Sequence, residues 1–278
     1  MNRCILQNEQ IKLVVLPERG GKLASLTDAE SGLELLAQPR DGVYPPLAPH
    51  MPFDDAAASG FDDVFPSMGE PARANEWQAV PDHGFIWSSP MRAEREPDGL
   101  TLSLNGSAWR YEKRVRLNGN RALLDWRIQN IGERQQPFLW VCHCLWRLEN
   151  DMRFFMPTEA AVDVLDALEP PAAMPQTVIA SGAMIKRYLA KPVGIGECGF
   201  VWPSAGLRVT MRFEGLEWLG FWMSNGGWHG ARQFAFEPAT GYYDTLARAQ
   251  RSGTLQWFLP GEERRFAITL QIEKEARI

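Results

Sequence analysis

The sequence lacks the segments and charge balance that mark several large protein classes. It contains no run of about 18 uninterrupted apolar residues, and the N-terminus has no charged stretch followed by a long apolar one. We therefore expect no membrane span and a cytoplasmic location. The net charge of −5 and the sequence pI near 5.5 provide no basic surface for nucleic acid or anionic lipid. Neither is expected as a partner.

Motifs for several kinds of catalysis are also missing. There is no glycine-rich phosphate loop ending in Gly-Lys-Ser/Thr, no Gly-x-Ser-x-Gly elbow and no His-Glu-x-x-His sequence. Only four cysteines occur, and none forms a Cys-x-x-Cys pair, although Cys142 and Cys144 would face the same side of one strand. We expect reduced thiols, with a disulfide or metal site as the alternative. No metal and no cofactor is predicted.

What the sequence does contain is length and aromatic side chains. A chain of 278 residues that is 45% hydrophobic is long enough for a large core, and we expect one domain over residues 1–278. It carries 11 Trp and 14 Phe, and many of these must pack in that core. Several tryptophans lie beside polar residues in loop-like stretches, where a flat apolar ring can pack on a sugar; these are Trp77, Trp87 and Trp228.

Alternating strands dominate the chain. In Arg265–Glu273 apolar residues occupy every second position, and Tyr111–Ile128 does the same on both sides of Asn118-Gly119. Asn-Gly is typical of a type I′ turn, so this second segment is predicted to be a hairpin. Gly20-Gly21 indicates a further turn. The sequence therefore predicts an all-β protein of antiparallel sheets packed face to face.

Three stretches interrupt this pattern. Pro39–Pro81 and Pro170–Pro203 are rich in Pro, Gly and Asp and alternate poorly, so we expect ordered loops over one end or one face of the sandwich. Thr158–Leu168 begins with a cap-like Thr and has helically spaced apolar residues, which indicates a short helix. Few other helices are expected.

Glu237 is the most informative candidate for chemistry. It ends the apolar run Gln233–Glu237, and Pro238 favours an extended backbone at this position. A carboxylate at the end of a buried strand is costly unless it is paired or used. Burial can also raise its pKa and suit it to act as a base near neutral pH. The alternative is a structural Glu satisfied by an Arg or by loop amides.

Two histidines are further candidates. His143 lies in the strongly apolar segment Phe138–Trp146, where it is either a proton-transfer group or a hydrogen-bonded core residue. His83 precedes Gly84, which allows a sharp turn or a close approach to a ligand. A surface imidazole in an Asx-type turn would show the same pattern.

Two adjacent acids, Asp62 and Asp63, lie between aromatic residues in the first long irregular stretch. Carboxylates bind vicinal sugar hydroxyls well, but Asp pairs also cap loops. Both interpretations are open. The remaining histidines, His50 and His229, have weaker surroundings and are not assigned to catalysis.

Seven short segments in order along the chain resemble the aldose 1-epimerase, or galactose mutarotase-like, family. They are Arg19–Leu26 with Ser31–Leu36, Gly60–Ser67, Pro81–Phe85 with Trp87, the strand around His143, Gly220–Trp228, Phe236–Gly241 and Pro260–Glu262. The resemblance covers nearly the whole chain. It implies a galactose mutarotase-like β-sandwich (supersandwich).

The resemblance also implies roles for individual residues. Glu237 would be the general base and His143 the general acid, with His83 as a second site histidine that binds or polarises the sugar. Opening and reclosing of the hemiacetal ring would exchange the α and β anomers of a free aldose without a cofactor. Substrate contacts are assigned within the matching segments to Asp62, Asp63, Trp87, Trp222 and Asn225.

The sequence departs from the family in two places. Cys144-Leu145-Trp146 replaces the aromatic pair after the strand histidine, and Glu197 is only a poor counterpart of a sugar-binding aspartate. Three alternatives therefore stay open: a non-catalytic carbohydrate-binding or sensing protein, a hexose-6-phosphate epimerase, and an isomerase or lyase on an oxidised sugar. The phosphate alternative relies on Arg73, Arg92 and Arg232. A small-molecule sugar is the expected partner, and a monomer or a homodimer is compatible with the sequence.

Overall fold

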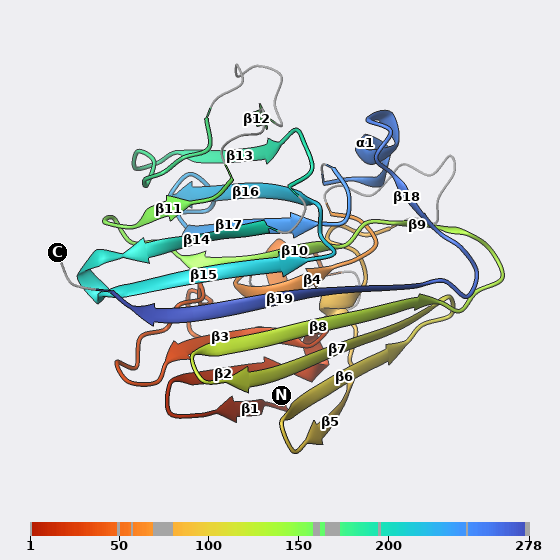
Figure 1. Ribbon diagram of the computed structural model, residues 1–278, viewed down its shortest axis with the longest axis horizontal. Helices are drawn as coiled ribbons and strands as arrows, with labels where there is room; N and C mark the ends of the chain where they lie inside the picture. Colours follow the sequence, from red (N-terminus) through yellow and green to blue (C-terminus); the bar gives the residue numbers. More distant parts are fainter. Residues whose placement is uncertain are drawn as a thin grey trace.

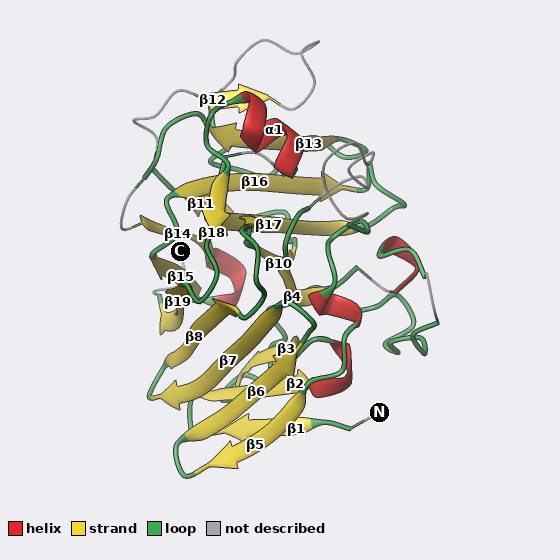
Figure 2. Cartoon of the chain, turned by 90° about the vertical axis from the view of Figure 1, so that its right-hand side faces the viewer, coloured by secondary structure: helices red, strands yellow, loops and turns green. Residues whose placement is uncertain are grey.

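The protein is an antiparallel β-sandwich, as predicted. The computed structural model describes residues 2–48, 51–56, 58–68, 80–157, 162–164, 173–193, 196–242 and 244–275. Within this part of the chain, the strands form a nine-stranded sheet, an eight-stranded sheet and a two-stranded ribbon. Figures 1 and 2 show the two large sheets as stacked layers, with loops gathered at one end.

The nine-stranded sheet carries the residues of interest. In spatial order its strands are β1 (Cys4–Gln7), β2 (Ile11–Leu16), β3 (Lys22–Asp28), β4 (Gly60–Val64), β10 (Val141–Arg147), β17 (Arg232–Ala239), β16 (Trp218–Asn225), β13 (Met184–Leu189) and β12 (Val162–Val164). Strands from both ends of the chain therefore meet at β10 and β17.

The eight-stranded sheet covers the inner face of the first. Its order is β11 (Arg153–Phe155), β14 (Gly196–Trp202), β15 (Leu207–Glu214), β19 (Glu263–Lys274), β8 (Arg121–Asn130), β7 (Trp109–Asn118), β6 (Gly99–Asn105) and β5 (Arg92–Glu96). The ribbon pairs β9 (Gln136–Phe138) with β18 (Gln256–Phe258). Among the described residues the one α-helix is α1 (Leu246–Arg251), which the sequence analysis did not predict.

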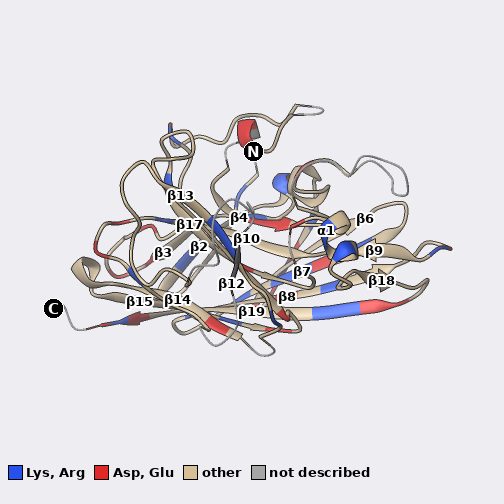
Figure 3. Cartoon of the chain, turned by 90° about the horizontal axis from the view of Figure 1, so that it is seen from above, with Lys and Arg blue, Asp and Glu red and all other residues tan. Residues whose placement is uncertain are grey.

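A continuous hydrophobic core fills the space between the two large sheets. On β19 it takes every second side chain, Phe266, Ile268, Leu270 and Ile272, as the alternation predicted. Residues of both charges occur along β7, β8 and β19 of the eight-stranded sheet (Figure 3). Some of them form ion pairs at the surface, such as Arg116–Asp125 and Arg127–Glu263. One face of this sheet therefore packs against the core, and the other is exposed to solvent.

The predicted hairpin is confirmed, but the predicted type I′ turn is wrong. β7 and β8 pair in antiparallel register, with Asn118 opposite Arg121. The two central residues are therefore Gly119 and Asn120, one position later than expected. Gly119 has a positive φ of 56°, whereas Asn120 is not among the positive-φ residues. Positive φ at the first central position alone is typical of type II′ rather than type I′ turns.

The two irregular stretches also contain strands that the sequence analysis missed. β4 lies in the first, and β13 and β14 lie in the second. β14 was hidden by Gly196 and Gly199, which interrupt its alternation. Both glycines are required by packing, because a Cβ atom would lie 1.9 Å from the Phe213 ring and 2.1 Å from the Val209 carbonyl oxygen, respectively. In the predicted helix Thr158–Leu168, residues 162–164 form β12 instead, and the rest lies outside the described residues.

Candidate active site

Strand periodicity turns His143 and Glu237 away from the core. On β10 the side chains of Cys142 and Cys144 belong to the core cluster, so His143 between them faces the opposite side. On β17 the core takes Phe234 and Phe236, which leaves Glu237 on the same outer face as His143. All four cysteines of the chain are free thiols, as expected.

Sheet register then brings these residues side by side. The β10–β17 pairing joins Val141 to Ala239 and Leu145 to Ala235, so His143 lies across from Glu237, midway between those pairs. The neighbouring strands extend this row, since His143 pairs with Asp62 on β4 and Glu237 pairs with Gly220 on β16. Residues separated by 94 positions in the chain thus become cross-strand neighbours on one face.

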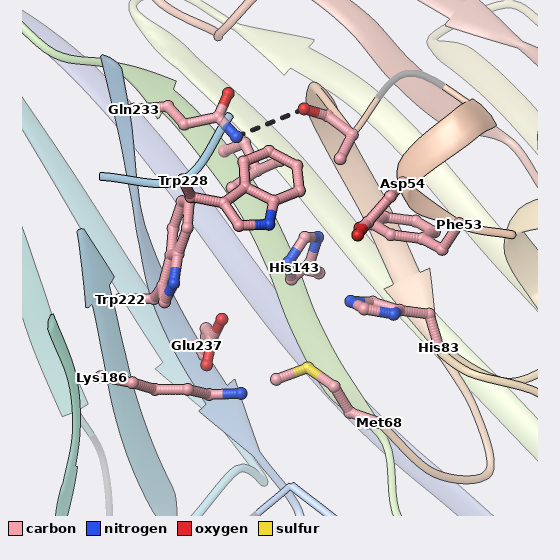
Figure 4. Close-up of a pocket in the computed structure, with 12 residues that line it drawn as sticks. Phe53, Asp54, Met68, His83, His143, Lys186, Trp222, Trp228, Gln233 and Glu237 are labelled. Atoms are coloured by element: carbon pink, nitrogen blue, oxygen red, sulfur yellow. Dashed lines mark hydrogen bonds between the residues drawn. The ribbon is translucent and has the colours of Figure 1, made fainter. Parts of the chain in front are cut away.

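A cavity of ≈ 120 Å³ opens on this face of the sheet. Figure 4 shows Glu237 and His143 pointing into it from the sheet and His83 from the facing loop. The cavity is lined by Phe53, Asp54, Ala58, Met68, His83, His143, Leu145, Lys186, Trp222, Trp228, Gln233 and Glu237. All three residues predicted to be catalytic therefore line one cavity.

Glu237 is buried in this cavity, and its carboxylate has fewer hydrogen-bond partners than it could accept. The residue is 2% exposed, and its Oε2 atom has no hydrogen-bond partner among the described residues. Burial raises the pKa of Glu237 to about 7, although the positive charge of Lys186 opposes this shift. Gly220 provides the space beside the carboxylate, because a Cβ atom there would lie 3.1 Å from Oε2. Glu237 is therefore able to gain or lose a proton near neutral pH.

The surroundings of His143 shift its pKa in the opposite direction from that of Glu237. Burial, followed by the charges of His83 and Lys186, holds the pKa of His143 well below its usual value. Its Nδ1 atom has no hydrogen-bond partner among the described residues. His143 is therefore a neutral imidazole at pH 7, with a ring nitrogen free for a ligand.

The loop that carries His83 is held in one conformation by the strand end beside it. His83 has φ of 59°, which is unusual for a residue with a side chain. Gly84 follows it at φ of 71°, and a Cβ atom there would lie 2.0 Å from the Phe65 carbonyl oxygen. That same carbonyl accepts a hydrogen bond from the Phe85 amide at 2.8 Å. The strained backbone is thus fixed by close packing rather than by a flexible turn.

The His83 ring is positioned by three neighbours. It stacks on Phe53 with ring centroids 3.8 Å apart, and it meets the edge of His143 at 4.9 Å. Its Nδ1 atom lies 2.8 Å from Oδ2 of Asp82. Burial alone would raise the pKa of Asp82, but the hydrogen bond and charge of His83 lower it below its usual value. The Asp82 carboxylate therefore fixes the orientation of this imidazole.

Lys186 lies on the wall of the cavity opposite His83 (Figure 4). It comes from β13, where the register aligns it with Trp222 on β16. Its Nζ atom lies 3.3 Å from Oδ2 of Asp244. A half-buried ammonium group is thus held beside Glu237 by a carboxylate that itself lies outside the cavity lining.

Four of the predicted substrate contacts do not line the cavity. Asp62 faces the same side of the sheet as His143, but Lys22 binds its Oδ2 atom at 2.6 Å. Asp63 faces the core, where Lys113 binds it at 3.0 Å. Trp87 packs against Phe53 in a T-shaped contact, with ring centroids 5.3 Å apart, and is not part of the cavity lining.

Asn225 is the fourth predicted substrate contact that does not line the cavity. It donates a hydrogen bond from Nδ2 to the Ile179 carbonyl at 2.8 Å and thereby fixes the end of β16. Trp222 is the predicted substrate contact that does line the cavity. His50, Arg73 and Trp77 lie outside the described residues.

Several cavity residues were not assigned from the sequence. Lys186 was missed because β13 was interpreted as part of an irregular stretch. Trp228 was considered only as an aromatic residue in a loop-like stretch, and Phe53, Asp54 and Gln233 were not singled out. A strand assignment for Met184–Leu189 would have placed Lys186 on the same face as Tyr188. The loop residues carry no such signal, because their position depends on the fold.

No helix among the described residues is long and apolar enough to cross a membrane. No three His, Cys, Asp or Glu side chains in this part of the chain gather in a way that could hold a metal ion.

Comparison with known proteins identifies the fold. No family model and no curated protein sequence matches the chain. Solved structures do match over its whole length. The Slr1438 protein of Synechocystis sp. PCC 6803 has 19% identity, covers 99% of this chain and 96% of its own, and gives a TM-score of 0.77.

A proposed aldose 1-epimerase of Escherichia coli K12 has 16% identity, with 98% and 99% coverage and a TM-score of 0.76. A galactose mutarotase related enzyme of Lactobacillus acidophilus has 14% identity, with 99% and 98% coverage and a TM-score of 0.72. At these identities the likeness concerns the fold. The chain has the galactose mutarotase-like fold that its resemblance predicted.

Proposed function

We propose that this protein is an aldose 1-epimerase that interconverts the α and β anomers of a free aldose. The observation that carries the proposal is the cross-strand placement of Glu237 and His143 in one cavity, with an unpartnered atom on each. Anomer exchange requires one group at the anomeric hydroxyl and another at the ring oxygen of the same sugar. The likeness to structures of proposed epimerases agrees with this activity.

The reaction needs one proton on the Glu237–His143 pair. When the anomeric hydroxyl gives up its proton to one member and the ring oxygen receives a proton from the other, the ring opens to the aldehyde. Rotation about the C1–C2 bond and the reverse transfers then close the ring as the other anomer. Because each transfer is reversed on closure, the pair ends with the proton it began with.

The pKa shifts indicate where that proton lies in the free protein. Glu237 has a raised pKa of about 7 and His143 a pKa well below its usual value, so the shared proton is on Glu237. Transfer to His143 gives the carboxylate and imidazolium form, in which Glu237 is the base and His143 the acid. The two forms differ only in the position of one proton, and a bound sugar can link them.

The surrounding residues suit a neutral sugar. Trp222 and Phe53 offer apolar ring surfaces, and His83 and Lys186 are hydrogen-bond donors on opposite walls. Two of the three arginines that suggested a phosphate are engaged elsewhere: Arg232 donates to Asn150 at 2.6 Å, and Arg92 pairs with Glu94 on the exposed strand β5. We therefore favour a free aldose over a hexose phosphate.

The proposal is tested by exchange NMR on purified protein with glucose, galactose and glucose 6-phosphate. Wild type should exchange the anomers of at least one free aldose faster than buffer. Glu237→Gln and His143→Asn should each lower the rate by about 10²–10⁴-fold, the usual contribution of a positioned acid or base. Asp98→Asn, which alters an exposed carboxylate paired with Arg114, is the matched control and should leave the rate unchanged. Binding without exchange by wild type would contradict the proposal and favour a sugar-binding protein.

A further inference from the structure

The cavity holds one more proton-transfer group than anomer exchange requires. Glu237 and His143 are sufficient for that reaction, because one group serves the anomeric hydroxyl and the other serves the ring oxygen. His83 lines the same cavity, and its ring points into it from the loop that faces the sheet (Figure 4). The ring centroids of His83 and His143 are 4.9 Å apart. His83 therefore lies close to the part of a bound sugar on which Glu237 and His143 act.

The contact with Asp82 decides which nitrogen of His83 is available to a ligand. Burial opposes ionisation of Asp82, but the hydrogen bond and charge of His83 outweigh it and lower the pKa of this carboxyl below its usual value. An ionised carboxylate only accepts hydrogen bonds, so Nδ1 of His83, which lies 2.8 Å from Oδ2 of Asp82, carries the hydrogen. In the neutral ring, Nε2 then has no hydrogen and can take up a proton. Ser-His-Asp triads prepare a histidine to act as a base through the same carboxylate contact.

The backbone and an aromatic neighbour keep the His83 ring in this orientation. Phe53 stacks on His83 at 3.8 Å with the planes 8° apart, and it meets His143 in a T-shaped contact at 5.3 Å. His83 has a positive φ of 59°, and such backbone strain persists where the surrounding structure fixes it, often at functional sites. The His83 side chain is 16% exposed, so solvent can replace its protons. The two imidazoles are thus held in a fixed relation, and His83 exchanges protons with water.

Ring opening gives the sugar a second acidic position. In the aldehyde, the hydrogen on C2 lies next to the carbonyl, so a base can remove it while the electron pair of the C2–H bond forms a C1–C2 double bond. Glu237, which holds the proton of the former anomeric hydroxyl, returns that proton to the carbonyl oxygen. The product is an enediol, and its formation consumes no oxidant or reductant. Glu237 is engaged at the carbonyl oxygen and His143 at the former ring oxygen, which leaves His83 as the base for C2.

From these observations we propose that the protein also enolises its aldose, with His83 as the base for the C2 proton and Asp82 as the residue that positions His83. A proton returned from His83 to C2 restores the aldose. A proton delivered to C1, while the Glu237 carboxylate takes the proton of the C2 hydroxyl, gives the 2-ketose. The inference rests on the proposed epimerase function, because the ring has to open at Glu237 and His143 before the C2 hydrogen becomes acidic.

The test follows carbon-bound deuterium by NMR in D₂O, on whichever of glucose and galactose wild type exchanges between anomers. Because His83 takes its protons from solvent, enolisation places deuterium at C2 of the aldose or at C1 of the ketose. Deuterium at C2 collapses the doublet of the anomeric proton to a singlet, so anomer exchange and enolisation are measured in one sample. Wild type should incorporate deuterium faster than buffer does.

The variants are compared by the ratio of deuterium entry to anomer exchange, because a distorted cavity would lower both rates together. His83→Gln should lower this ratio by about 100-fold or more, the contribution of a positioned base, and Asp82→Asn by about tenfold or more. Asp98→Asn, which alters an exposed carboxylate paired with Arg114, is the control and should change neither rate. An unchanged ratio in Asp82→Asn would overturn the positioning role of Asp82.

The outcomes separate enolisation from the epimerase proposal. If wild type exchanges anomers but incorporates deuterium no faster than buffer, His83 only binds the sugar, so enolisation is overturned and the epimerase proposal stands. An unchanged ratio in His83→Gln would also overturn enolisation by His83. If no anomers are exchanged, glyceraldehyde decides, because its chain is too short to close a ring and requires no opening step. Deuterium entry at its C2 that His83→Gln abolishes supports the His83 step while the epimerase proposal fails, and absence of entry overturns both.

Discussion

Two buried carboxylates, Asp63 and Glu237, lie on opposite faces of the same sheet and differ in how they are compensated. Asp63 points into the core, where Lys113 and Tyr111 each contact it at 3.0 Å and the Trp126 indole donates to it at 2.9 Å. Glu237 points into the cavity with an unpartnered oxygen and a pKa raised to about 7. A fully partnered buried charge joins the two sheets, whereas an incompletely partnered one is kept available for a ligand.

The largest effect expected from this comparison is on stability. Asp63→Asn leaves the Lys113 ammonium buried without its carboxylate, which should cost about 3–5 kcal/mol in the free energy of unfolding. Urea denaturation measures the loss. Asp98→Asn removes an exposed carboxylate from Arg114 and should cost at most about 1 kcal/mol. Similar small losses in both variants would show that the Asp63 network does not hold the sheets together.

Unlike Asp63→Asn, the substitution Glu237→Gln should increase the free energy of unfolding. The pKa of Glu237 is raised from 4.5 to about 7 on folding, so ionisation opposes folding above pH 7. This cost vanishes as the pH falls below 4.5, where the carboxyl is protonated in both states. At pH 8 the variant should be more stable than wild type by about 3 kcal/mol, since one pKa unit corresponds to about 1.4 kcal/mol.

Urea denaturation of Glu237→Gln and wild type at pH 8 and pH 5 tests this sign. The gain should shrink to less than about 1 kcal/mol at pH 5. A variant less stable than wild type at pH 8 would mean that the carboxylate is well solvated or paired in the folded protein. Glu237 and Asp63 would then not differ as described.

The pH dependence of anomer exchange tests whether Glu237, unlike the fully partnered Asp63, gains and loses a proton near neutral pH. The pair is active with one proton, which it loses as the pH rises through the pKa of Glu237 at about 7. Above that pH, kcat/KM should fall about tenfold per pH unit. Exchange rates measured between pH 5 and pH 9 test this expectation. A rate that rises through pH 7 and stays high would mean that the Glu237 carboxylate acts as a base while another group supplies the proton.

The smallest effect concerns Lys186. Its charge opposes the upward pKa shift of Glu237, so Lys186→Met should raise the pKa of Glu237 further and move the fall in activity to higher pH. Lys186→Arg keeps the charge and should leave the fall near that of wild type. The same pH series measures both variants. An unchanged profile in Lys186→Met would show that Asp244 already neutralises the ammonium group.

Much of the fold was predictable because half-buried strands repeat with period two. Arg265–Glu273 and Tyr111–Ile128 alternate cleanly, and both are strands. The pattern failed at β14, where glycines required by close packing replace the apolar residues that would mark the strand. It also failed at β4, which is buried on both faces and carries two acids.

The candidate site was predictable only in part. His143 and Glu237 could be recognised because each interrupts an otherwise apolar strand. Asp62 and Asp63 were assigned together as sugar ligands, but neighbouring residues on a strand face opposite sides, and the structure places them on different faces. Lys186, Phe53 and Trp228 depend on which strands and loops meet across the sheet. Sequence spacing alone carries no such information.

The most direct test of the account is anomer exchange by wild type and Glu237→Gln, measured by NMR at pH 7 on a free aldose such as glucose or galactose. The account predicts exchange faster than buffer in wild type and a loss of about 10²–10⁴-fold in a variant that is at least as stable. Unimpaired exchange in Glu237→Gln would contradict the assignment of Glu237 to the chemistry.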